Sequence, residues 1–147
     1  MIRERLTPRD HWTWRTEPFS FLSQGWRIGD FVFTGGQVAL AADGSVIAPG
    51  DVAVQTRVVY ENIRQVLAEA GVGMADVFKI NSFYVCNGSD EELEVFWEDM
   101  ASARRDFFEE PGPCGTGVRV QGLVYPGLVI EVEAVAALPS NRVEARS

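Results

Sequence analysis

Residues 111–136 read PGPCGTGVRVQGLVYPGLVIEVEAVA, a glycine-rich entry followed by two segments in which apolar side chains alternate with others. Alternation with a period of two is typical of strands that bury one face. The two segments flank a short loop at residues 124–126. The sequence therefore predicts an antiparallel hairpin in which Val118 faces Val132 and Val120 faces Ile130.

The same register places Arg119 opposite Glu131 on the other face of the hairpin. A shift by one residue would turn Arg119 among the apolar side chains, because a slip of one residue exchanges the two faces of a strand. An exposed cross-strand ion pair contributes roughly 0.2–1 kcal/mol. The pair is either such a surface ion pair or one wall of a binding site, and the sequence leaves both interpretations open.

The chain has 147 residues, of which 46% are hydrophobic and 23% are charged. This length and balance are typical of a single globular domain that buries roughly 68–70% of its unfolded surface. No run approaches the roughly 18 apolar residues of a membrane span, and no apolar run follows the basic residues at the start. We expect a soluble, cytoplasmic protein with no membrane partner.

The formal net charge is -8, from 13 Lys and Arg against 21 Asp and Glu. Lys79 is the only lysine, and the arginines are scattered along the chain. Binding to a phosphate backbone depends on clustered positive charge. Nucleic acid is therefore not expected as a partner.

The cysteines, Cys86 and Cys114, are far apart and lack the paired spacing of a metal site. His11 is the only histidine, and it lies in an N-terminal extension, which disfavours a catalytic Cys-His pair. We expect no metal and no cofactor. Cys114 lies in the glycine-rich entry, where a thiol is more accessible than in a strand.

The chain begins with an arm, residues 1–18, whose Trp12 and Trp14 need a surface to cover on the domain or on a neighbouring subunit. Strands are predicted at residues 19–24, 26–28 and 31–34, with a Gly29-Asp30 turn between the last two. Gly35-Gly36 follows, and two glycines after a strand indicate a bulge or a close approach to the backbone.

A helix is predicted from the N-cap Asp51 to Gly71, with an apolar stripe facing a sheet or another helix. A central strand over residues 77–86 follows. Ser89 and Glu92 form a capping box that opens a second helix ending near Phe108. Arg104 and Arg105 complement the negative end of that helix, so they receive no catalytic role. This order predicts an α+β domain with two helices on one face of the sheet, ending at residue 138 before a flexible tail, residues 139–147.

Four segments together resemble the RidA (YjgF) family, which is also called endoribonuclease L-PSP. They are GDFVFTGGQVAL (residues 29–40), VQTRVVYENIRQVLAEAG (54–71), MADVFKINSFYV (74–85) and VIEVEAVA (129–136). The resemblance covers about residues 19–138. It implies a chorismate-mutase-like α+β fold, with a mostly antiparallel sheet and two helices packed on one face. It also implies a homotrimer with ligand clefts between subunits, which agrees with a sheet face that two helices leave uncovered.

Typical family members hydrolyse reactive enamines or imines such as 2-aminoacrylate, and a cleft arginine holds the substrate carboxylate. The resemblance assigns the family's glutamate to Glu131 and the cleft backbone to the glycines before Gln37. The arginine position falls on Gly115 or Thr116, so this chain lacks that arginine. Arg119 lies four residues beyond Gly115, about 13 Å along a strand, which is too far to replace it. We therefore expect a substrate other than a simple 2-imino acid.

The predicted site has Glu131 as general acid and base. Its substrate-binding residues are predicted to be Phe19, Phe21, Gly35, Gly36, Cys114, Gly115, Thr116 and Arg119. A non-catalytic small-ligand binder or regulatory trimer is the alternative, because the arginine is missing. RNA cleavage, which the older family name suggests, is disfavoured by the net charge of -8.

Overall fold

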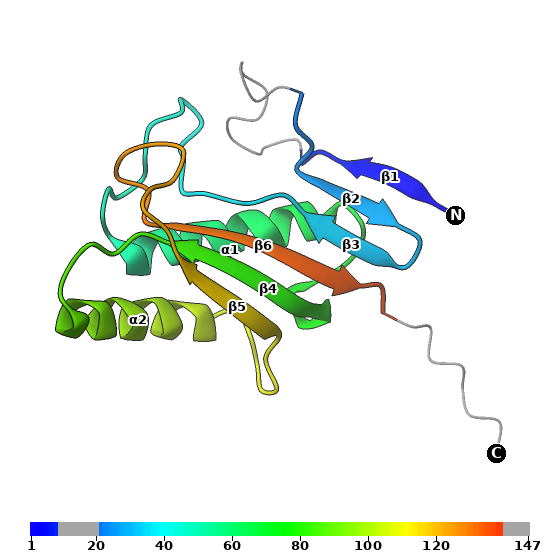
Figure 1. Ribbon diagram of the computed structural model, residues 1–147. Helices are drawn as coiled ribbons and strands as arrows, with labels where there is room; N and C mark the ends of the chain where they lie inside the picture. Colours follow the sequence, from blue (N-terminus) through cyan, green and yellow to red (C-terminus); the bar gives the residue numbers. More distant parts are fainter. Residues whose placement is uncertain (9–20, 140–147) are drawn as a thin grey trace.

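The computed structural model describes residues 1–8 and 21–139. In these residues six strands form one sheet, and α1 (Val52–Ala68) and α2 (Asp90–Arg105) cover one of its faces (Figure 1). A short 3-10 helix, η2 (Met74–Asp76), precedes β4. The strands are β1 (Arg3–Leu6), β2 (Gly25–Ile28), β3 (Phe31–Thr34), β4 (Val77–Tyr84), β5 (Cys114–Arg119) and β6 (Ile130–Ala137).

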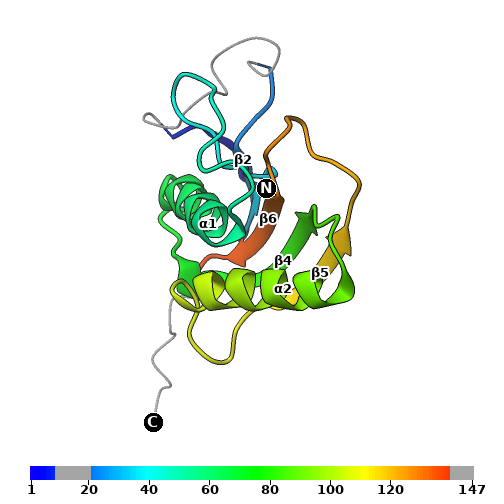
Figure 2. The ribbon, with the colours of Figure 1, turned by 90° about the vertical axis from the view of Figure 1, so that its left-hand side faces the viewer.

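The strand order is β1-β2-β3-β6-β4-β5. All neighbouring strands are antiparallel except β4 and β5, which are parallel. Parallel neighbours need a crossover connection, and α2 provides it. Figure 2 shows α1 and α2 on the same side of the sheet. The predicted α+β fold, with a mostly antiparallel sheet and two helices on one face, is confirmed.

The predicted hairpin is wrong, because β4 lies between β5 and β6. Phe83 of β4 is level with Val118 on one side and with Glu131 on the other. Arg119 is level with Tyr84, a buried residue on the helix-covered side, whereas Glu131 points to the opposite side. Arg119 and Glu131 therefore form no cross-strand pair. Alternation identified two strands with distinct faces, but α2 returns the chain parallel to β4, and periodicity carries no information about that.

Both helices begin as their sequences predict. The Asp51 side chain accepts a hydrogen bond from the Val54 N–H at 2.9 Å, and Gly71 follows α1 with a φ of 70°. At the start of α2, Ser89 and Glu92 form the predicted capping box. These signals depend on residues within one turn of each other, so they do not need the rest of the fold.

The N-terminal half departs from the prediction in two places. Arg3–Leu6, assigned to the arm, forms the edge strand β1 against β2, and Leu6 is buried. Residues 21–24 form a turn and bends, so the described part of the predicted strand 19–24 is not a strand. The β2–β3 hairpin is confirmed, with Gly29 at a φ of 60°. His11, Trp12, Trp14 and Phe19, and the predicted tail from residue 140, lie outside the described residues.

The core lies between the helices and one face of the sheet. The predicted stripe of α1 supplies Val59, Ile63 and Leu67, which pack with Val132 and Ala134 of β6. The other face, here called the open face, has no helix over it in the described part of the chain. It carries Arg3, Arg5, Trp26, Ile28, Phe31, Phe33, Lys79, Asn81, Phe83, Cys114, Thr116, Val118, Glu131, Glu133 and Val135. Among the described residues, the helices are too short or too polar to cross a lipid bilayer.

Gly25 is a close contact between the sheet and α1, and adding a side chain there is expected to destabilise the fold. A Cβ at Gly25 would lie 2.7 Å from Val66 Cγ1 and 2.8 Å from the Phe33 carbonyl oxygen. Overpacking of this kind costs about 1–3 kcal/mol. Gly25→Ala should therefore lower the free energy of unfolding in urea by that amount. The control is Gly122→Ala, because a Cβ there meets nothing within 4 Å and should leave stability unchanged or slightly raised.

Candidate functional site

The Gly35-Gly36 pair forms a bulge between β3 and β6. Phe33 pairs with Val135 and Gln37 pairs with Val132, so four residue steps on one strand face three on the other. Across this irregularity, the Ala134 N–H donates to Thr34 Oγ1 at 2.9 Å. The bulge that the two glycines predict is therefore present, and bulges re-aim neighbouring side chains.

Glu131 lies directly over Gly36. A Cβ at Gly36 would overlap the Glu131 carboxylate and would lie 3.0 Å from its Cδ. The predicted close approach to the glycine backbone is therefore made by the side chain of Glu131. Among the predicted site residues that the structure describes, Gly36 and Glu131 are far apart in the sequence and lie in contact.

The surroundings of Glu131 change its acidity. Burial, and to a lesser extent the charge of Glu133 two residues along β6, raise the pKa of the Glu131 carboxyl above its ordinary value. Glu133 itself accepts a hydrogen bond from Asn81 Nδ2 at 2.8 Å. Arg119, the predicted cross-strand partner of Glu131, is on the other side of the sheet. Glu131 is thus a half-buried carboxyl that holds its proton more tightly than an exposed one does.

The other predicted site residues are dispersed. Cys114 and Thr116 share the open face with Glu131, but β4 separates β5 from β6 by two strand spacings, about 10 Å. Gly115 and Arg119 face the helix side. Phe21 is exposed, at 76% of its surface, and Phe19 lies outside the described residues. A single chain does not form the predicted cleft.

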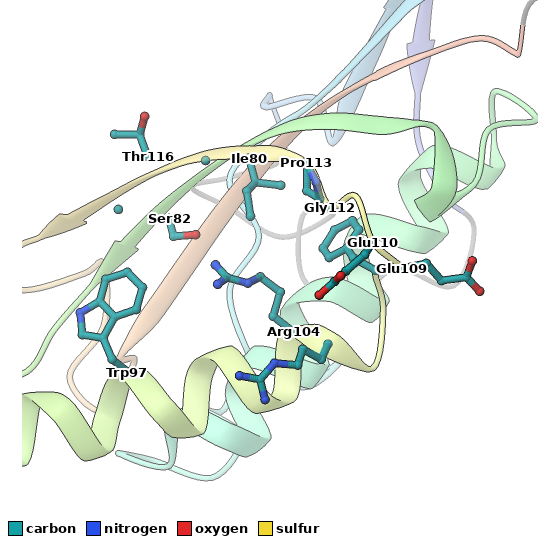
Figure 3. Close-up of a pocket in the computed structure, with 13 residues that line it drawn as sticks. Ile80, Ser82, Trp97, Arg104, Glu109, Glu110, Gly112, Pro113 and Thr116 are labelled. Carbon is teal, nitrogen blue, oxygen red and sulfur yellow. The ribbon is translucent and has the colours of Figure 1, made fainter.

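The structure also has a pocket between β5 and α2, here called the helix-side pocket, with a volume of about 410 Å³ (Figure 3). It exists because Gly115 and Gly117 place no side chain between the strand and the helix. A Cβ at Gly117 would lie 3.0 Å from Trp97 Cη2. The pocket is lined by Ile80, Ser82, Trp97, Arg104, Arg105, Phe108, Glu109, Glu110, Gly112, Pro113, Gly115, Thr116 and Gly117.

Arg104 is the lining residue that the sequence interpretation missed. It received only a role at the end of the helix, yet it is half-buried and faces the sheet. The signal was its position, because Arg104 follows Trp97 and Met100 on one face of α2, at intervals of seven and four residues. Within residues 1–8 and 21–139, no three His, Cys, Asp or Glu side chains are grouped as metal ligands.

Residues 15–138 match the endoribonuclease L-PSP family. The chain belongs to this family, which is also known as the YjgF or RidA family. A RutC family protein of Pyrococcus abyssi is 32% identical over 120 residues, covering 82% of this chain and 88% of that protein. The 3-aminoacrylate deaminase RutC of Acinetobacter baylyi is 31% identical over 110 residues, covering 75% of this chain and 81% of that protein. Both relatives agree with the family resemblance that the sequence shows.

A solved structure shows the same fold. The crystal structure of Escherichia coli TdcF with bound serine is 25% identical to this chain and has a TM-score of 0.72. The similarity covers 92% of this chain and 98% of TdcF. The L-PSP family fold therefore extends over nearly the whole chain.

Proposed function

We propose that this protein is a RidA-like deaminase or hydrolase of small molecules. Its substrate would be an enamine, an imine or a related reactive metabolite, differing from simple 2-imino acids. The observation that carries the proposal is the Glu131 carboxyl, half-buried over Gly36 with a raised pKa. A relative named 3-aminoacrylate deaminase supports the reaction class.

Glu131 suits the proton transfers that this reaction needs. Hydrolysis of an imine adds water to the carbon of the C=N bond and releases ammonia, leaving a carbonyl compound. One proton must leave the water and protons must reach the nitrogen. A carboxyl whose pKa lies closer to neutrality than usual can accept the first and donate to the second, directly or through one water. Glu131 is therefore the proposed general acid and base.

We propose a homotrimer, because the isolated chain leaves its open face and the edge strand β5 uncovered. Every residue of β5 is exposed, although the alternation of its sequence is typical of a strand with one buried face. Phe31, Phe33 and Val118 on the open face are exposed at 47%, 43% and 41%. Apolar surface of this kind is typical of an interface. In such a trimer, the dispersed residues of β5 would face Glu131 of a neighbouring copy.

The proposal is tested by following keto-acid and ammonia release from enamines and imines of increasing size. We expect hydrolysis of bulkier substrates, and a rate with 2-iminopropionate at least about 10²-fold below that of a typical RidA protein. The physical reason is that neither Gly115 nor Thr116 can supply a bidentate, charge-assisted contact to the substrate carboxylate. A rate with 2-iminopropionate equal to that of a typical RidA protein would show that the expected substrate class is wrong.

The second candidate function is a trimer that binds a small ligand without chemistry. The absence of an arginine at Gly115 and Thr116 favours it, because binding does not require the orientation that catalysis does. The two functions are distinguished by incubating the protein with keto acids and with ring-cleavage products. Thermal stabilisation without any product would support the binder, whereas product formation would support the enzyme.

A further inference from the structure

The side chain of Gln37 is fully buried beside the proposed site, and the proposed chemistry does not use it. Its backbone pairs with Val132: the Gln37 N–H donates to the Val132 carbonyl oxygen at 2.9 Å, and the Val132 N–H donates back at 3.2 Å. Residues paired in this way direct their side chains to the same face of the sheet. Gln37 therefore lies on the helix side with Val132, while its neighbour Gly36 lies on the open face under Glu131.

The amide group of Gln37 holds the carbonyl group of Gly35. Gln37 Nε2 donates to the Gly35 carbonyl oxygen at 3.3 Å and to Gln24 Oε1 at 3.1 Å. A carbonyl oxygen only accepts hydrogen bonds, so the NH₂ end of the Gln37 amide is the end that faces Gly35. The Gly35 carbonyl group is thereby directed toward the buried Gln37 side chain and away from the open face.

The same peptide group directs its N–H toward the open face. The Gly35-Gly36 peptide is trans, and the C=O and N–H of a trans peptide point in opposite directions. The Gly36 N–H therefore points away from the Gln37 side chain, toward the side on which Glu131 lies. In the described part of the chain, this N–H donates to no protein acceptor. A peptide between two glycines turns easily because neither residue has a Cβ. The contact with Gln37 therefore decides which end of the peptide faces the site.

The other end of the Gln37 amide indicates that this residue does more than fill the core. Gln37 Oε1 is buried and accepts no hydrogen bond within residues 1–8 and 21–139. A buried acceptor without a donor destabilises the folded protein, because it has lost its hydrogen bonds to water. A methionine of similar length would fill the same space without that loss. What the amide adds over methionine is the fixed orientation of the Gly35-Gly36 peptide.

We infer that Gln37 is a positioning residue, which keeps the carbonyl group of the Gly35-Gly36 peptide turned inward so that an N–H donor, and not a carbonyl oxygen, borders the site at Glu131. This inference rests on the proposed role of Glu131. A carbonyl oxygen in that place would repel the carboxylate form of Glu131 and would accept a hydrogen bond from its acid form. With the N–H there, Glu131 is able to release its proton, as the proposed reaction requires.

The test is an NMR titration of the Glu131 carboxyl carbon, with Glu131→Gln used to assign its signal. In Gln37→Met the peptide is free to turn its carbonyl group to the open face, so the Glu131 carboxyl should hold its proton about tenfold more tightly than in the wild type. The matched control is Gln24→Met, which removes the other acceptor of Gln37 Nε2, leaves the bond to Gly35 and should keep the wild-type proton affinity. An unchanged or lower proton affinity in Gln37→Met, or an equal rise in both variants, would overturn the inference.

The charged surroundings of Glu131 are the same in all of these proteins except the assignment variant. The titratable side chains on the open face of the strands around Glu131 are Glu133 on β6, Lys79 on β4 and Cys114 on β5. On β3 the open face carries two phenylalanines and no charge. Because Gln37→Met and Gln24→Met alter none of these groups, a difference between them reports on the peptide.

Kinetics separate failure of this inference from failure of the proposed function. Gln37→Met should lower kcat for an enamine or imine at least about tenfold and move the acid limb of the pH–rate profile to higher pH, whereas Gln24→Met should keep the wild-type profile. Loss of activity in Gln37→Met with an unmoved profile would overturn the positioning role. A wild-type protein without turnover would refute the proposed function, and the NMR titration would still decide the role of Gln37.

Hydrogen exchange of the wild-type protein covers the case in which Gln37→Met does not fold. The Gln37 side-chain amide is buried and bonded twice, so it should exchange at least about a hundredfold more slowly than the exposed side-chain amide of Gln121. The Gly36 N–H should exchange faster than the Gln37 N–H, which bonds to Val132. Fast exchange of the Gln37 amide, or protection of the Gly36 N–H, would overturn the inference.

Discussion

Replacing Glu131 with glutamine is expected to lower kcat for an enamine or imine substrate by about 10²–10⁴-fold. Glutamine keeps the size of the side chain over Gly36 but cannot transfer a proton. The measurement is the release of ammonia and keto acid, with the mass of the assembly checked in parallel. Unchanged turnover in a variant that keeps the wild-type mass would exclude Glu131 as the acid and base. Glu98→Gln, on the exposed side of α2, is the control.

The same variant should be more stable than the wild type at neutral pH. Burial raises the folded-state pKa of Glu131 above its ordinary value of 4.5, so the folded protein favours the protonated form. That contribution is fully present below pH 4.5 and is lost as the pH rises through the folded-state pKa. The difference in unfolding free energy between Glu131→Gln and wild type should therefore be near zero below pH 4.5 and favour the variant above it. Urea unfolding at several pH values tests this, and a difference of the opposite sign would contradict it.

Replacing Phe33 with aspartate is expected to convert the proposed trimer into monomers and to abolish turnover. Phe33 lies on β3, in the open face, and is 43% exposed in the single chain. Burying an unpaired carboxylate in an interface costs several kcal/mol, about enough to separate subunits at micromolar concentration. The measurement is molecular mass by light scattering, together with the rate of hydrolysis.

The matched control is Val95→Asp on α2. Val95 is 58% exposed and lies outside the open face, so its replacement should change neither mass nor turnover. A Phe33→Asp variant with the mass of the wild type would show that the open face is not the interface. A wild-type protein of monomer mass would refute the trimer itself.

The candidate site was predicted in part. The glycine pair and Glu131 were both selected from the sequence, and the structure places them in contact. The glycines predicted a close approach, and the family resemblance selected the glutamate. Arg104 was missed, because an arginine in the last turn of a helix already has an electrostatic explanation. Its half-buried position opposite the glycines of β5 becomes visible only in the tertiary structure.

The sequence by itself determined the helices, their caps and the alternating faces of the strands. Asp51, Ser89 and Gly71 act within one turn of the chain, and periodicity needs only neighbouring residues. The tertiary structure decided which strands are neighbours. It separates β5 from β6 by β4 and turns Arg119 and Glu131 to opposite sides of the sheet. Strand pairing depends on the positions in the sheet to which the two connections, α2 and residues 120–129, return the chain. A local sequence pattern does not specify which strands these connections make neighbours.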